Sequence, residues 1–187
     1  VFELGMGNLV VAVDQSSTLP YKVKDLPQVG YIRAISSEGV LSMEPTKILT
    51  TTDIGPPNSV KQIKNSGVEM IIYKSPKSIE DIIDLITKIS TSLEVNIKGN
   101  AVKKNIKQIM NEINGITNSY QNSPKVAFFM NPATGSYTAA GSGTNANYLI
   151  ELMGGNNIFS EEFNRYQKVN KEEILKYNPD IILVASH

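Results

Sequence analysis

The sequence predicts an α/β protein built of two related lobes with mainly parallel sheets. Short aliphatic strands alternate with amphipathic helices along the chain, and this alternation implies crossover connections that make neighbouring strands parallel. A Gln-Asn-Ser-Pro break at 121–124 separates a first series of these elements from a second. Both series contain a capped short helix, a proline and then an aliphatic strand, at 37–49 and at 169–184. This internal echo favours two lobes built alike.

The first lobe is expected to consist of short elements separated by Gly and Pro. Strands are assigned to runs of aliphatic and β-branched residues, and helices to apolar residues at helical spacing. Gly5 and Gly67 serve as helix stops, and Ser37 serves as a helix cap. The expected elements are, in chain order, a helix end at 1–5, a strand at 9–13, a helix at 38–43, a strand at 47–50, a helix from 58 or 59 to 65, and a strand at 68–73.

Two amphipathic helices follow this lobe's strands. The first lies over 79–89 behind Ser78, which forms a weak capping box with Asp81. The second has its apolar stripe over 101–116, and its length of about 20 residues corresponds to roughly 30 Å. That is long for a helix confined to one lobe of this size, although a plain surface helix explains the stripe equally well.

The second lobe is expected to begin after Pro124. Its elements are assigned by the same aliphatic runs and caps, with Asn170 as the cap of the last helix. They are, in chain order, a strand at 125–130, a short strand at 136–140, a helix from 144 or 145 to the Gly-Gly pair at 154–155, a helix at 170–175 and a strand at 181–184.

Composition excludes several classes of protein. The chain has 187 residues, and its 18 basic and 18 acidic side chains balance, so nothing indicates a nucleic-acid surface. It has no cysteine, and therefore no disulfide framework and no thiolate metal site. No run is long and apolar enough to span a bilayer, and no signal region is present. We interpret both ends as cut, with any export signal lost from the N-terminal side.

The segment 26–33 (Leu-Pro-Gln-Val-Gly-Tyr-Ile-Arg) carries the strongest chemical signal. If it is extended, Tyr31 and Arg33 point to the same side. A phenolate is an axial ligand of haem iron in some proteins, and a nearby permanent cation favours the charged phenol. Arg33, one of two arginines in the chain, could instead hold a haem propionate. On spacing alone, a half-buried structural tyrosine beside a solvated arginine is the commoner interpretation.

Further motifs accompany this segment along nearly the whole chain. Together they resemble the haem-binding substrate-binding proteins of bacterial ABC haem importers, which are bilobed receptors related to cobalamin and siderophore binders. The Val-Gly-Tyr-x-Arg segment and the Gly-Pro-Pro loop are the most specific parts of this resemblance. The remaining parts are 13–20 (Val-Asp-Gln-Ser-Ser-Thr-Leu-Pro), 34–45, 139–144 (Ala-Ala-Gly-Ser-Gly-Thr) and 149–155.

The resemblance implies a fold and a function. It implies two Rossmann-like lobes, at 1–98 and 122–187, joined by a single long helix at 99–121. It implies that the protein binds ferric haem, as a transported ligand, in the cleft between the lobes and delivers it to an ABC permease. Such a receptor is a metal-binding transport protein rather than an enzyme. We expect a monomer, exported to the periplasm or lipid-anchored on the outer face of the cytoplasmic membrane.

The resemblance also implies which residues serve the site. Tyr31 matches the haem-iron ligand and Arg33 its neighbour in the haem site. The further haem-contact residues carried over in this way are Gly55, Pro56 and Pro57 in the first lobe, and Gly141, Ser142, Arg165 and Tyr166 in the second. Many family members carry a basic residue where Ser142 stands, so a propionate contact there is in doubt. A tight structural turn and a solvated Arg165 are the alternatives.

One acidic residue per lobe docks such receptors onto the permease, and Glu38 and Glu172 match these by position. Glu173 is the alternative to Glu172, and ordinary helix N-terminal acids are the alternative to both. His187, the single histidine, is a candidate second iron ligand.

Two other functions stay open. A binder of cobalamin or of another iron chelate belongs to the same class, although cobalt in cobalamin needs no protein phenolate. A nucleotide-using α/β enzyme has weak support from the turn at 141–144, whose free N–H groups could hold an anion. That turn lacks both the Rossmann glycine spacing and a P-loop lysine. With no Cys and a terminal His, no Ser-His or Cys-His catalytic arrangement is expected.

Overall fold

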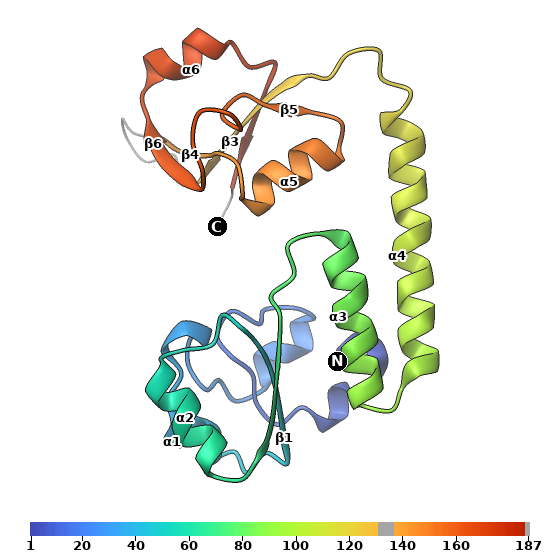
Figure 1. Cartoon of the computed structure of the whole chain (residues 1–187), viewed down its shortest axis with the longest axis vertical. Helices are drawn as coiled ribbons and strands as arrows, with labels where there is room; N and C mark the ends of the chain where they lie inside the picture. Colours follow the sequence, from blue (N-terminus) through green and yellow to red (C-terminus); the bar gives the residue numbers. More distant parts are fainter. Residues whose placement is uncertain (131–136, 186–187) are drawn as a thin grey trace. The chain divides into compact units, whose positions relative to one another are not determined.

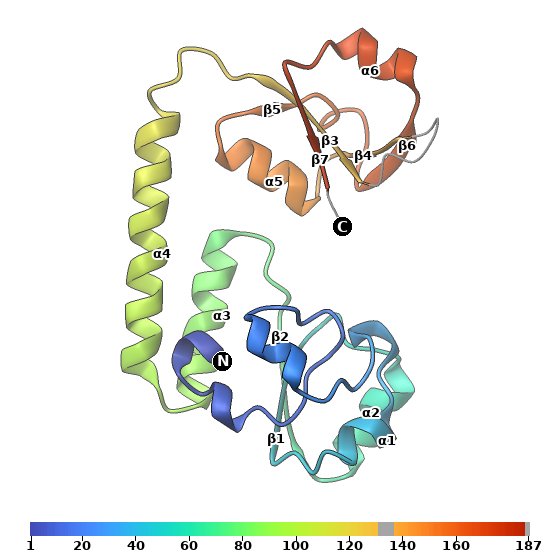
Figure 2. The same cartoon turned by 180° about the vertical axis from the view of Figure 1, so that it is seen from behind.

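A computed structural model of the chain describes residues 1–130 and 137–185 (Figures 1 and 2). The chain divides into two compact units, Val1–Asn105 and Ile106–His187. The boundary between them falls inside helix α4 (Asn96–Thr117).

The first unit contains a two-stranded parallel sheet. Strand β1 (Lys47–Thr51) pairs with β2 (Glu69–Tyr73), so that Thr51 lies opposite Tyr73 at the carboxyl ends. Both strands were expected. The other elements of this unit are the 3-10 helices η1 (Phe2–Leu4), η2 (Gly7–Leu9), η3 (Tyr21–Asp25) and η4 (Ile32–Ala34), and the α-helices α1 (Ser37–Leu41), α2 (Pro57–Asn65) and α3 (Ile79–Ser92).

Side-chain caps fix where the helices of this unit begin. Ser78 accepts a hydrogen bond from the Asp81 N–H at 3.2 Å, as expected for α3. Helix α1 is capped one residue earlier than expected, because Ser36 rather than Ser37 accepts from the Gly39 N–H. The Asp81 carboxylate does not complete a capping box, since it accepts hydrogen bonds from Lys74 and from the Lys77 N–H instead.

The expected strand at 9–13 is wrong. Leu9 ends the 3-10 helix η2, and Val13 forms an isolated bridge with Gln28. The Val13 N–H donates to the Pro27 carbonyl and the Val13 carbonyl accepts from the Val29 N–H, both at 3.0 Å. In the described residues the sheet of β1 and β2 has two strands. An apolar cavity of about 740 Å³ is lined by residues of the run Val10–Val13 and by residues of β1. The apolar run at 9–13 is therefore not hydrogen-bonded to the β1–β2 sheet as a third strand.

Helix α4 starts earlier than its apolar stripe suggested. It packs against α3, as both views of the chain show (Figures 1 and 2). Ser90 of α3 is buried, and a Cβ atom at Gly99 of α4 would lie 2.4 Å from the Ser90 Oγ. Gly99 therefore permits the two helices to approach closely.

The second unit contains a mixed sheet rather than a mainly parallel one. Strand β3 (Lys125–Met130) runs parallel to β5 (Asn156–Asn157) and to β7 (Ile181–Val184). The aliphatic run at 181–184 predicted β7 as a strand. It runs antiparallel to β4 (Tyr137–Ala140), which in turn runs antiparallel to β6 (Tyr166–Val169). Sequence reasoning missed β5 and β6, because β5 has two residues and β6 is exposed at three of its four positions.

Helices α5 (Asn145–Leu152) and α6 (Lys171–Tyr177) complete the second unit. Asn170 caps α6 in a full capping box with Glu173, as the sequence predicted for the cap. The core is aromatic: Phe159 stacks on Phe163 with ring centroids 5.4 Å apart. The buried residues of this core are Ala127, Phe129, Ala139, Phe159, Val169 and Ile174.

Candidate functional site

Tyr31 lies at the start of a 3-10 turn rather than in an extended segment. It is the residue that precedes η4, and the Ala34 N–H donates to its carbonyl at 2.7 Å. Arg33 lies inside that turn, so the same-side geometry expected of residues i and i+2 in a strand does not apply. Gly30 adopts a left-handed φ of 101°, which shapes the chain immediately before Tyr31.

The Gly-Pro-Pro loop is hydrogen-bonded to this turn. The Gly55 N–H donates to the Ile32 carbonyl at 2.9 Å, and the Ile35 N–H donates to the Gly55 carbonyl at 2.8 Å. A Cβ atom at Gly55 would lie 3.2 Å from the Arg33 carbonyl oxygen, so a glycine permits this close approach. The structure thus brings Tyr31 and Arg33 together with the loop at 55–57 on the first unit.

The two polar side chains of the turn differ in their partners. Tyr31 is 47% exposed, and within residues 1–130 and 137–185 no hydrogen bond involves its hydroxyl. The Arg33 Nη2 atom lies 3.7 Å from the Asp53 Oδ1 atom, an ion pair between exposed side chains. The site therefore offers an unpartnered phenol and a guanidinium whose described partner is one carboxylate.

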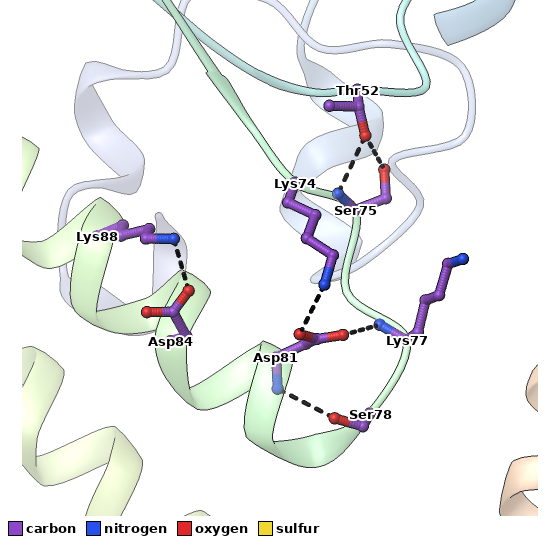
Figure 3. Close-up of polar contacts among 8 residues, drawn as sticks. All are labelled: Thr52, Lys74, Ser75, Lys77, Ser78, Asp81, Asp84 and Lys88. Atoms are coloured by element: carbon purple, nitrogen blue, oxygen red, sulfur yellow. Dashed lines mark hydrogen bonds and ion pairs between the residues drawn. The ribbon is translucent and has the colours of Figure 1, made fainter.

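Asp53 is held in place from the ends of the two strands. The Ser75 hydroxyl donates to the Asp53 Oδ2 atom at 2.6 Å. The Ser75 N–H donates to the Thr52 Oγ1 atom at 3.2 Å, and the two hydroxyls lie 3.2 Å apart (Figure 3). Sequence reasoning gave Asp53 no role of its own in the site, although its place at the carboxyl end of a parallel strand was a usable signal.

A second loop, part of the 13–20 motif to which the sequence assigned no site residue, lies next to the Tyr31 turn. The Gln15 N–H donates to the Gly30 carbonyl at 2.9 Å, which holds the loop at 14–17 beside it. Burial disfavours the charged form of Asp14, but hydrogen bonds from Ser16 and Ser17 outweigh it and keep the pKa of Asp14 below its ordinary value. The Asp-x-Ser-Ser pattern is typical of such an Asx turn.

The predicted residues of the second unit are also neighbours of one another. The Gly141 N–H donates to the Arg165 carbonyl, and the Arg165 N–H donates to the Ser142 carbonyl, both at 2.8 Å. Tyr166 opens β6 opposite Ala140 and therefore lies in a strand. Within the described ranges the Arg165 guanidinium, which is exposed, has no ion pair or hydrogen bond.

The turn at 141–144 uses two of its four N–H groups inside the second unit. The N–H groups of Gly141 and Ser142 donate to the carbonyls of Arg165 and Phe163. The first turn of α5 is capped by the Thr144 hydroxyl, which accepts from the Asn147 N–H at 3.1 Å. Two of the N–H groups that an anion site would use are therefore already engaged.

The two predicted docking acids lie in the first turns of α1 and α6. Glu38 and Glu172 are both exposed, and neither forms an ion pair or a side-chain hydrogen bond among the described residues. Glu173, the alternative, accepts a hydrogen bond from the Asn170 N–H at 2.7 Å and so serves as a cap. His187 lies outside the described residues.

The described residues lack two kinds of feature. No helix there is long and apolar enough to cross a membrane. No group of three or more His, Cys, Asp or Glu side chains there is close enough to hold a metal ion.

A family model described as periplasmic binding protein matches residues 1–187, the whole chain. The chain belongs to the periplasmic binding protein family. A vitamin B12-binding protein of Pectobacterium carotovorum is 24% identical over 184 residues, covering 98% of this chain and 66% of the relative. One from Vibrio vulnificus is 26% identical over 187 residues, covering the whole chain and 67% of the relative. The chain thus spans about two thirds of the length of these curated relatives.

Solved structures of periplasmic binding proteins have the same fold. A periplasmic heme-binding protein from Roseiflexus sp. RS-1 superposes with a TM-score of 0.89 at 30% identity, over 98% of this chain and 70% of the other. A periplasmic heme-binding protein of Vibrio cholerae gives a TM-score of 0.88 at 27% identity, over 99% of this chain and 71% of the other. A vitamin B12-binding protein of Vibrio cholerae gives 0.82 at 21% identity over all of this chain and 71% of the other, which bears on the fold alone.

These findings confirm the two-lobe α/β class of binding protein. The relatives are named as binding proteins rather than enzymes, in line with the function expected from sequence. They divide between haem and vitamin B12, so family membership by itself leaves the ligand open.

Proposed function

We propose that this binding protein captures ferric haem and that Tyr31 ligates the iron. The observation that carries the proposal is the exposed, unpartnered phenol of Tyr31 in the same turn as the guanidinium of Arg33. A phenolate is a hard anionic donor suited to ferric iron. A guanidinium in the same turn offers a partner to a haem propionate.

Cobalamin is the second candidate, and the names of the curated relatives favour it. The solved structures with the higher identities are heme-binding proteins. Chemistry favours haem as well, because cobalamin carries amide side groups and needs no protein phenolate, whereas haem has an open axial position and two carboxylates.

The test is a parallel titration of the full-length protein with hemin and with cyanocobalamin. We expect hemin to give saturable visible bands that include the charge-transfer absorption of a ferric phenolate. We expect cyanocobalamin, followed by calorimetry, to give no binding at matched concentration. A hemin spectrum unchanged from that of free hemin, together with saturable cobalamin binding, would assign the protein to the second candidate.

The remaining haem contacts are proposed from both units. Gly55, Pro56 and Pro57 adjoin the Tyr31 turn, which supports them as part of the haem site. In the second unit the neighbours Gly141, Ser142, Arg165 and Tyr166 are supported by their mutual contacts and by the free guanidinium of Arg165. Arg165 would serve a propionate, and Tyr166, which is partly exposed, would serve the porphyrin edge.

We propose delivery to an ABC permease through Glu38 and Glu172. Both are exposed acids on short capped helices, one in each unit, and neither is engaged with its own unit in the described residues. Exposed carboxylates without internal partners suit docking into basic pockets. The proposal includes an exported monomer, in the periplasm or lipid-anchored on the outer face of the cytoplasmic membrane, with lobes at 1–98 and 122–187 and a joining helix at 99–121.

A further inference from the structure

The Arg33 guanidinium already faces a carboxylate that belongs to the protein. Its Nη2 atom lies 3.7 Å from the Asp53 Oδ1 atom, which is ion-pair distance but beyond a normal hydrogen bond. Arg33 is 61% exposed and Asp53 is 47% exposed, and no other acidic partner of Arg33 is present in residues 1–130 and 137–185. An exposed ion pair at this distance is weak, so another anion can readily replace Asp53 as the partner of Arg33.

The two members of the pair are not equally fixed. The Asp53 Oδ2 atom accepts from the Ser75 hydroxyl at 2.6 Å. Because the Ser75 hydroxyl donates its hydrogen to Asp53, the Thr52 hydroxyl is the donor in the 3.2 Å hydrogen bond between the two hydroxyls. Hydroxyls in such a chain polarise one another and stabilise the charge at its end.

The strands themselves anchor this chain of hydroxyls. The Thr52 N–H donates to the Tyr73 carbonyl at 2.8 Å, and the Ser75 N–H donates to the Thr52 Oγ1 atom at 3.2 Å, so both residues are pinned at the carboxyl ends of β1 and β2 (Figure 3). Asp53 is therefore a carboxylate held in position, whereas the longer, exposed Arg33 side chain is free to turn.

We infer that Asp53 is a built-in competitor that occupies Arg33 until a carboxylate of the ligand replaces it. This inference rests on the proposed binding of haem and adds how the site selects its ligand. Asp53 neutralises Arg33 in the free protein and so discourages simple anions. A ligand must then supply both an anionic group for Arg33 and an atom that binds Tyr31. Asp53 lowers the affinity for the ligand in exchange for this selectivity.

The decisive substitution is Asp53→Asn, which removes the charge but keeps an oxygen that accepts from Ser75. We expect it to bind hemin more tightly at low salt, by a factor of up to about fivefold, which is the order of a charge interaction across ~4 Å in water. We expect the gain to shrink as salt rises, because the Debye length falls to about 8 Å at physiological ionic strength.

Two variants provide matched controls. Asp84→Asn makes the same change of net charge in the same unit, where Asp84 pairs with Lys88 on α3, and should leave hemin affinity unchanged. Asp53→Glu keeps the charge and should not bind hemin more tightly than the wild type. Thermal unfolding of each variant establishes that the unit stays folded.

A double-mutant cycle with Arg33→Ala provides the sharpest readout. If Asp53 acts through Arg33, Asp53→Asn should raise affinity in the wild-type background and should have no effect once Arg33 is alanine. The gain should also vanish with the dimethyl ester of hemin, whose propionates carry no charge. If Asp53 has a purely structural role, Asp53→Asn should lower the stability of the protein, and its effect on affinity should be the same for hemin and for the dimethyl ester.

The outcomes separate this inference from the function on which it rests. If hemin binds the wild type but Asp53→Asn binds it equally or less tightly than Asp84→Asn does, the competitor role is overturned and haem binding stands. A gain that persists in the Arg33→Ala background also overturns it. If the wild type does not bind hemin, both proposals are overturned.

Discussion

The side-chain amide of Asn157 donates a 2.7 Å hydrogen bond to the Oδ1 atom of Asn147 inside the second unit. Asn157 is 2% exposed. Its amide also donates to the Ala140 carbonyl at 2.9 Å, and its Oδ1 atom accepts from the Phe159 N–H at 3.2 Å. This buried network joins β5 to α5 and to the end of β4, where the 141–144 turn begins.

Asn157→Ala should destabilise the second unit by about 2–4 kcal/mol, because it leaves buried carbonyl oxygens without a donor. Urea unfolding followed by circular dichroism measures the loss. Asn156→Ala, at the exposed neighbour on the same strand, is the control and should stay within about 0.5 kcal/mol. Equal effects of the two substitutions would show that the network contributes little.

Gly141→Ala should destabilise the turn at 141–144, whereas Gly115→Ala should not. A Cβ atom at Gly141 would lie 2.0 Å from the Phe163 carbonyl oxygen, so the backbone must shift. A Cβ atom at Gly115, inside α4, meets nothing within 4 Å, and alanine there should stabilise the helix by about 0.5–1 kcal/mol. The midpoints of thermal unfolding should move in opposite directions, and a Gly141→Ala protein as stable as the wild type would contradict the assigned packing.

The contribution of Asp81 to stability should depend on pH in the acid range (Figure 3). A hydrogen bond from the Lys77 N–H, and then one from Lys74, hold the pKa of Asp81 below its ordinary value. A lowered folded-state pKa means that the stabilisation is fully present above the unfolded pKa, about 3.9, and is lost as pH falls through the folded pKa. Asp81→Asn should thus unfold at a lower temperature than the wild type at pH 7, and the two should converge in acid. A difference independent of pH would refute this assignment.

Tyr31→Phe should abolish the charge-transfer bands of bound hemin and speed its dissociation, because it deletes the ligating oxygen and keeps the ring. Stability should change by about 1 kcal/mol at most, since the hydroxyl has no partner among the described residues. Stopped-flow transfer of hemin to an excess acceptor measures the dissociation rate. Arg33→Ala should have a milder effect in the same direction. Wild-type spectra and rates in Tyr31→Phe would place the iron ligand elsewhere.

Reversing the charge of Glu38 and Glu172 to Lys should leave the hemin spectrum intact and weaken stimulation of the transporter ATPase, since lysines facing basic pockets repel them. Glu80→Lys is the matched control, because Glu80 is an exposed acid in the first turn of α3. Stimulation of the ATPase by Glu80→Lys should equal that of the wild type. If the docking variants also equal the wild type, Glu38 and Glu172 are ordinary helix-end acids.

The sequence by itself determined the elements whose signals are local. Aliphatic runs predicted β1, β2, β3 and β7, and side-chain caps predicted α3 and α6, because periodicity and capping act within a few residues. The order of motifs along the chain also placed it in the right group of binding proteins. Local signals sufficed for these features since the apolar runs and the capping side chains lie within or next to each element.

Tertiary structure alone decided which segments pair and which side chains meet. The apolar run at 9–13 is not a strand, because its Val13 pairs with the loop at 27–29 and no sheet edge receives it in the described residues. Strand β6 exists because β4 provides a partner for polar residues that carry no strand signal of their own. Arg33 faces Asp53 rather than sharing a strand face with Tyr31, since the Gly55 hydrogen bonds fold that segment into a turn. Such contacts join residues 14 or more positions apart, and no local pattern encodes them.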